Sequence, residues 1–281
     1  MTDHADQQPP RDHAPADKGE QDLIERAKLI LGQDGRVLGV WLAGSFGRGD
    51  NDELSDVDLW VVVDEADMVS FCRDWPITSE EMAPAVLRRQ VGDHPVFTQV
   101  TEDWLRYDVT VGTPFEIPAR TRSTLRPLYD PSGLSAELGD PRPPKQPDPE
   151  RVRSLTEEFL RVLGLLPVVV GRGELIVGRQ GAGLCLSMLV DLILEDVAVE
   201  DRGGALALNR LLPPDRRQAL LGLPPFQATR PSVIDAHLAC AAAFLPLARD
   251  LHTRCGLVWP QQLEESVRRH LARALSITVP A

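Results

Sequence analysis

Apolar positions in the first half of the chain change between helical and strand-like spacing. Between Asp22 and Leu31 they recur at the spacing of an amphipathic helix, which predicts a first helix. Residues 67–90 predict one or two further helices, interrupted near Trp75-Pro76. Four shorter runs have the length and content of strands, and the last two predict a hairpin: residues 37–44, 56–64, 96–100 and 106–111. This order predicts a small mixed sheet with flanking helices, the first part of an α+β fold.

The second half shows only helical spacing. No strand with clean alternation appears, and helical patterns cover residues 151–166, 174–199, 214–221, 231–254 and 260–274. Before them, the segment DPRPPKQPDP has five prolines in ten residues, which disfavours a helix and keeps the backbone extended. The pattern therefore predicts a disordered tail (1–20), a sheet domain (21–139), a linker (140–150) and an all-α domain (151–281).

The overall composition is that of a globular protein in a reducing compartment. No run approaches the roughly 18 consecutive apolar residues of a membrane span, so we expect no membrane association. The polar, acidic start has no basic and then apolar order of a secretory signal, which favours a cytoplasmic protein. The four cysteines lie far apart without a C-x-x-C pair, so we expect reduced thiols and no zinc site.

One segment, GSFGRGDNDELSDVDL at residues 44–59, carries the candidate chemistry. Asp56 and Asp58 are two positions apart at a strand, so both side chains project to one side while Val57 and Leu59 face the core. Paired carboxylates attract hard divalent cations, and Mg²⁺ takes one or two carboxylates together with phosphate oxygens. The pair therefore predicts a Mg²⁺ site.

The start of the same segment is suited to binding phosphate. Gly44 lets the backbone approach a bulky anion, and Ser45 can open a helix or turn whose free amide groups point at phosphate. Arg48 follows about one turn later, where it could contact the phosphates or pair with nearby acids on the surface. Both readings of Arg48 stay open at this point.

A third carboxylate, Asp108, lies in the strand-like segment RYDVTV. The hairpin interpretation allows this strand to lie beside the Asp-x-Asp strand, with Tyr107 and Val109 facing the opposite side. Three acids on one sheet face would suit two metal ions roughly 4 Å apart, one activating an acceptor hydroxyl and one steadying a leaving pyrophosphate.

These residues resemble a known superfamily. The Gly-Ser pair, a spacing of about ten residues and the Asp-x-Asp resemble the DNA polymerase β-type nucleotidyltransferases over residues 20–120. With a helical second domain, the match is closest to the antibiotic nucleotidyltransferases that modify aminoglycosides or lincosamides. The resemblance implies a nucleoside triphosphate substrate and Mg²⁺.

We therefore expect transfer of AMP from ATP to a hydroxyl of a small, antibiotic-like acceptor in the cleft between the domains. The net charge of −12 makes a nucleic-acid acceptor unlikely and fits a cationic one better. The alternative is a toxin-like nucleotidyltransferase that modifies tRNA or protein. A non-enzymatic binding module is disfavoured because the acidic set is intact.

Glu174 is the candidate catalytic residue of the second domain. It lies in GRGELIVGRQGAG, beside Arg172 and Arg179, where it opens a long helix. A carboxylate base would help to deprotonate the acceptor hydroxyl, and Asp108 is the rival for that role. The alternative is that these charges are ordinary surface pairs at a helix start.

Overall fold

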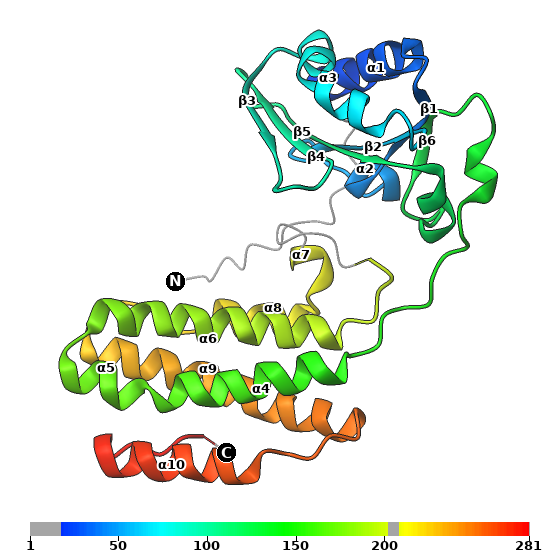
Figure 1. The fold of residues 1–281 in the computed structure, drawn as a ribbon. Helices are drawn as coiled ribbons and strands as arrows, with labels where there is room; N and C mark the ends of the chain where they lie inside the picture. The colour runs from blue at the N-terminus through cyan, green and yellow to red at the C-terminus, as the bar shows by residue number, and fades with distance from the viewer. Residues whose placement is uncertain (1–17, 202–207, 281) are drawn as a thin grey trace, which may run out of the picture. The chain divides into compact units, whose positions relative to one another are not determined.

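The computed structural model describes residues 18–201 and 208–280, and the chain divides into two units after Arg142 (Figure 1). Residues 1–17 of the expected disordered tail lie outside the described residues, and residues 18–20 open the first helix. The elements of the first unit are α1 (Lys18–Gln33), β1 (Val37–Leu42), α2 (Gly44–Arg48), β2 (Val57–Val63), α3 (Met68–Met82), β3 (Ala85–Gln90), β4 (Val96–Thr101), β5 (Arg106–Gly112), η1 (Pro114–Ala119), β6 (Arg126–Tyr129) and η2 (Leu134–Glu137).

The six strands form one mixed sheet, which confirms the predicted class. Their order is β3-β4-β5-β2-β1-β6; β2 and β5 run parallel, and the other neighbouring pairs are antiparallel. The predicted strands correspond to β1, β2, β4 and β5. The prediction of helix through residue 90 is wrong at its end, because residues 85–90 form β3.

Each face of the sheet has its own apolar core. Helices α1 and α3 cover one face (Figure 1), where Leu23 and Trp75 belong to the same buried cluster as the inward side chains of β2 and β5. A smaller cluster on the other face includes Trp41 and Trp60, whose ring centroids are 5.1 Å apart, and Ile117 of η1. Only part of this second face is covered by apolar residues, and the carboxylates lie on it.

All regular secondary structure in the described residues of the second unit is helical, as the sequence predicts. Its elements are α4 (Pro149–Gly164), α5 (Leu166–Arg172), α6 (Leu175–Asp196), α7 (Leu208–Leu211), α8 (Pro214–Leu221), α9 (Arg230–Arg254) and α10 (Gln261–Leu275). The core contains the stacked rings of Phe159 and Phe244, with centroids 3.9 Å apart. The sequence pattern misses the short helices α5 and α7, which lie between the predicted helices.

The long helices α6 and α9 form the centre of this unit. By length and composition each could cross a membrane, although the sequence has no long uninterrupted apolar run. Half of the most apolar window of α9 is buried inside the protein, and both helices contribute to the same core. The corresponding share for α6 is 39%, and core helices of soluble proteins pass the same test of length and composition.

Candidate active site

The turn after β1 is built directly against the Asp-x-Asp strand. Gly44 has φ +54°, in the left-handed region, and a Cβ built on it would lie 1.8 Å from Oδ2 of Asp58. The amide of Ala43 donates to the carbonyl oxygen of Asp58 at 2.8 Å. Both the backbone conformation and the space therefore require glycine, which brings the main chain of the turn into contact with the Asp58 carboxylate.

The short helix α2 holds this turn in place. The amide of Gly47 donates to the Ala43 carbonyl at 2.7 Å, and the amide of Gly49 donates to the Ser45 carbonyl at 2.9 Å. A Cβ on Gly47 would lie 2.2 Å from the carbonyl oxygen of Thr124, so α2 packs against the chain segment that precedes β6. Ser45, at the start of α2, is partly buried.

Three carboxylates share one face of the sheet. Asp58 of β2 and Asp108 of β5 are direct partners in the parallel register, and Asp56 comes one residue before β2. The residues that flank the two paired aspartates are at most 1% exposed and face the opposite core: Val57, Leu59, Tyr107 and Val109. The structure thus agrees with the predicted alternation and with the predicted proximity of Asp108 to the Asp-x-Asp strand.

The carboxylates perturb one another. Burial raises the pKa of Asp58 to about 6, the negative charges of Asp56 and Asp108 add to this, and Arg48 opposes it. Burial also raises the pKa of Asp108, and a hydrogen bond from Thr98 partly offsets this by lowering it. Ionising all of these groups together is unfavourable, and a bound cation would relieve the repulsion.

The carboxylates supply only part of the ligand set that a metal ion needs. Within residues 18–201 and 208–280, no three His, Cys, Asp or Glu side chains are close enough together to hold a metal ion unaided. Mg²⁺ does not need such a set, because it binds through one or two carboxylates and completes its shell with water and phosphate oxygens. The oxygen-only donors Asp56, Asp58 and Asp108 fit Mg²⁺ that arrives with a nucleotide.

Arg48 pairs with a neighbouring acid. Its Nε lies 3.2 Å from Oδ1 of Asp50, and its charge lowers the pKa of Asp58. The next acidic residue, Asp52, accepts hydrogen bonds from the amide of Leu54 and the hydroxyl of Ser55, as expected of a turn-forming residue. The structure therefore shows the expected ion pair of Arg48 with a nearby acid. Arg48 is also close enough to Asp58 to influence its pKa, a position that is compatible with a phosphate contact.

Two polar residues of the site are absent from the sequence-based set. Thr98 of β4 is the register partner of Asp108, and Arg106 lies on the same face of β5, with its guanidinium donating to the Leu54 carbonyl at 2.9 Å. Alternate residues of a strand face the same side of a sheet, so the segment RYDVTV places Arg106 on the same face as Asp108. Thr98 could not be identified because its pairing depends on the register of the hairpin.

Glu174 is not part of this carboxylate group. It belongs to the second unit, where it is the exposed residue before α6, and its side chain makes no capping hydrogen bond. Arg151 of α4 pairs with Asp191 of α6 at 2.6 Å, so the start of α4 lies beside the end of α6. Within this unit, Glu174 is therefore at the end of α6 that lies away from the interdomain linker.

The site thus combines a Gly-Ser turn against an Asp-x-Asp strand with a third aspartate on the adjacent parallel strand. Residues 24–118 match the family model described as a nucleotidyltransferase domain. The first unit therefore contains a nucleotidyltransferase domain, and the protein is a transferase.

Several solved structures match the chain at low sequence identity. An aminoglycoside 6-adenyltransferase from Bacillus subtilis matches with 14% identity and a TM-score of 0.43, covering 89% of this chain and 95% of that one. A CCA-adding enzyme in complex with CTP matches with 13% identity and a TM-score of 0.33, covering 90% and 72%. The Thermotoga maritima CCA-adding enzyme complexed with tRNA matches with 12% identity and a TM-score of 0.34, covering 91% and 73%. No curated protein matches the chain. At these TM-scores none of the likenesses assigns an acceptor.

Proposed function

We propose that the protein transfers AMP from ATP to a hydroxyl group of a small, cationic, antibiotic-like acceptor in the cytoplasm. The observation that carries this proposal is the convergence of Asp56, Asp58 and Asp108 on one sheet face, with the main chain at Gly44 pressed against Asp58. Nucleotidyl transfer needs a held triphosphate, neutralised charge and an acceptor oxygen aligned with the α-phosphorus. The turn and the carboxylates are suited to the first two demands.

Each residue has a distinct role in the proposal. Asp56 and Asp58 would hold Mg²⁺, and Asp108 would complete a second ion site or orient the acceptor. The metal supplies charge neutralisation of the triphosphate. Gly44 and Ser45 would offer main-chain amides to the phosphates, and Arg48 would add a positive charge there.

The reaction also requires a place for one proton. The acceptor oxygen forms a bond to the α-phosphorus, the bond from that phosphorus to the bridging oxygen of pyrophosphate breaks, and the hydroxyl proton must leave. We assign the proton to a carboxylate, either Asp108 or Glu174. The exposed side chain of Glu174 is free to meet a substrate, since it makes no capping bond within its own unit.

Glu174→Gln separates these two assignments. If Glu174 is the base, the substitution lowers kcat by about two orders of magnitude while the KM for nucleotide stays the same. Glu265→Gln, on the exposed surface of α10, is the matched control and should change neither constant. A change in acceptor KM alone would make Glu174 a binding residue, and unchanged constants would leave the role to Asp108.

The acceptor class rests on charge. The net charge of −12 opposes binding of polyanionic nucleic acid and attracts cationic molecules such as aminoglycosides. The test is mass spectrometry of aminoglycosides, lincosamides, tRNA and cell lysate after incubation with the protein, each NTP and Mg²⁺. The proposal predicts addition of one AMP to a small cationic compound, which would confer antibiotic resistance. Modification of tRNA or protein alone would instead support the toxin-like alternative.

A further inference from the structure

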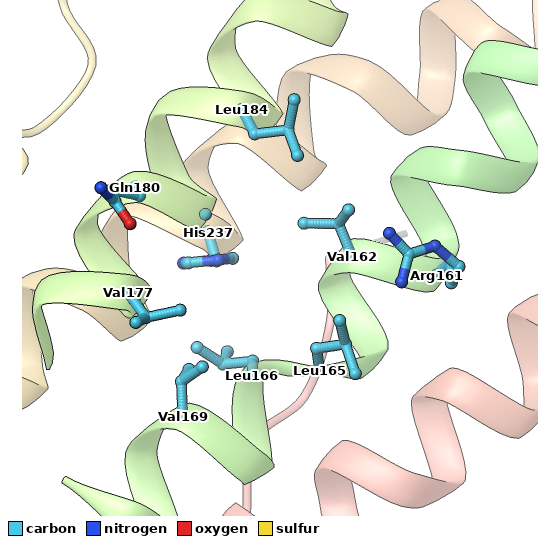
Figure 2. Close-up of a pocket in the computed structure, with 11 residues that line it drawn as sticks. Arg161, Val162, Leu165, Leu166, Val169, Val177, Gln180, Leu184 and His237 are labelled. Atoms are coloured by element: carbon cyan, nitrogen blue, oxygen red, sulfur yellow. The ribbon is translucent and has the colours of Figure 1, made fainter. Parts of the chain in front are cut away.

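The second unit contains a pocket that the proposed reaction does not use. It has a volume of about 250 Å³ and lies among α4, α5, α6 and α9 (Figure 2). Its wall is mostly aliphatic, with Val162, Leu166, Val169, Val177 and Leu184 among the lining residues. All of its lining residues belong to the second unit.

Three polar side chains interrupt the apolar wall: Arg161, Gln180 and the imidazole of His237. His237 of α9 is only 2% exposed, and Figure 2 shows its ring among the lining side chains. Its Nδ1 lies 2.7 Å from the carbonyl oxygen of Val233. A carbonyl can only accept, so Nδ1 must carry the hydrogen and donate it. Burial lowers the pKa of His237, so the ring is neutral at physiological pH and Nε2 is left as an acceptor.

A glycine leaves this acceptor uncovered. A Cβ built on Gly181 of α6 would lie 3.2 Å from Nε2 of His237, so an alanine there would place a methyl group against the nitrogen. Within the described part of the chain, Nδ1 of His237 has a hydrogen-bond partner and Nε2 has none. Nε2 is not among the fully enclosed polar atoms that lack a partner, so it opens into the pocket, where a ligand that carries a donor can form a hydrogen bond with it.

We propose that this pocket binds a neutral, largely apolar, planar small molecule that donates one hydrogen bond to Nε2 of His237. A cavity of roughly 150 Å³ lined by aliphatic and aromatic side chains holds benzene, so a pocket of this volume holds a bicyclic ring of about ten non-hydrogen atoms. The pocket disfavours a charged ligand, because its wall is mostly aliphatic and its one charged lining residue, Arg161, is already paired with Glu158 at 2.7 Å. The inference does not depend on the identity of the acceptor in the transfer reaction.

Indole and benzofuran are the matched probes for this site. They have the same shape, but indole has an N–H donor where benzofuran has an oxygen. Calorimetry should give at least tenfold tighter binding of indole, and the Nε2 resonance of His237 in ¹⁵N-labelled protein should move with indole. Equal affinity for the two probes, or no binding of either, would overturn the proposal.

Gly181→Ala tests the same contact from the opposite wall. Alanine favours a helix more than glycine does, so the variant should fold, and its methyl group should lower indole affinity at least tenfold. The control is Gly183→Ala in the same helix, because a Cβ there meets nothing within 4 Å. Unchanged indole affinity in Gly181→Ala would contradict the assignment. Self-association of the wild type that Gly181→Ala abolishes would also contradict it, because a second copy would then occupy the pocket.

Discussion

Position 44 requires glycine for two independent reasons, backbone conformation and lack of space, and two variants distinguish their effects. Its φ of +54° disfavours any residue with a Cβ, and the Cβ itself would collide with Asp58. Gly44→Ala should therefore displace the carboxylate and lower kcat/KM at least tenfold, as loss of groups that orient metal ligands typically does. Gly49→Ala is the control, since Gly49 also has a positive φ, +77°, but its Cβ would meet nothing within 4 Å. Equal losses in the two variants would mean that backbone strain, and not the contact with Asp58, is responsible.

Asp58 makes the stability of the metal-free protein depend on pH. Its pKa is about 6 in the folded protein, above the ordinary 3.8, so the folded state keeps the proton to higher pH than the unfolded state does. The free energy of unfolding should therefore fall as pH rises from about 4 to about 6, by at most about 3 kcal/mol. Asp58→Asn removes this contribution, so in EDTA the variant should be more stable than wild type at pH 7.5 and lose that advantage at pH 4. A stability difference that is the same at both values would exclude a raised pKa of Asp58.

At the scale of elements, the buried strands follow from the sequence and the edge strands do not. The apolar runs of β1 and β2 predict central strands, and the Asp in RYDVTV predicts a carboxylate beside them. The edge strand β3 has no such apolar run, because most of its residues are exposed and two of them are arginines. The other edge strand, β6, has four residues and contains Pro127, which a central strand would not tolerate. Asp108 was therefore predictable, whereas its partner Thr98 depends on pairing that no local pattern specifies.

Asp148 caps the N-terminus of α4. The Asp148 carboxylate accepts hydrogen bonds from the amides of Glu150 and Arg151, and Pro149 occupies the first turn. Asp148→Ala should lower the free energy of unfolding of the second unit by about 1 kcal/mol, measured by urea denaturation. Asp140→Ala is the control, because Asp140 is 89% exposed and makes only a 3.5 Å pair with Arg122. A loss for Asp140→Ala equal to that for Asp148→Ala would contradict the capping role.

At the scale of the whole molecule, the reaction class is better defined than the substrate. The domain match covers residues 24–118, and the motif residues all lie within it. The helical unit has no comparable motif, because acceptor sites are formed by side chains from several helices whose spacing varies with the acceptor. Its long helices were predictable from their periodicity, whereas the pocket beside His237 depends on how α4, α5, α6 and α9 pack together and was not predictable.

The central claim is metal-dependent transfer of a nucleotidyl group by the carboxylates of the first unit. The most direct measurement follows two labels, ATP with ³²P at the α or at the γ position, incubated with a pool of aminoglycosides and lincosamides, wild-type protein and Mg²⁺. We expect the α label to enter the acceptor and the γ label to leave in pyrophosphate, and we expect EDTA or Asp56→Asn to abolish both. Entry of the γ label into the acceptor, or full transfer by Asp56→Asn, would contradict it.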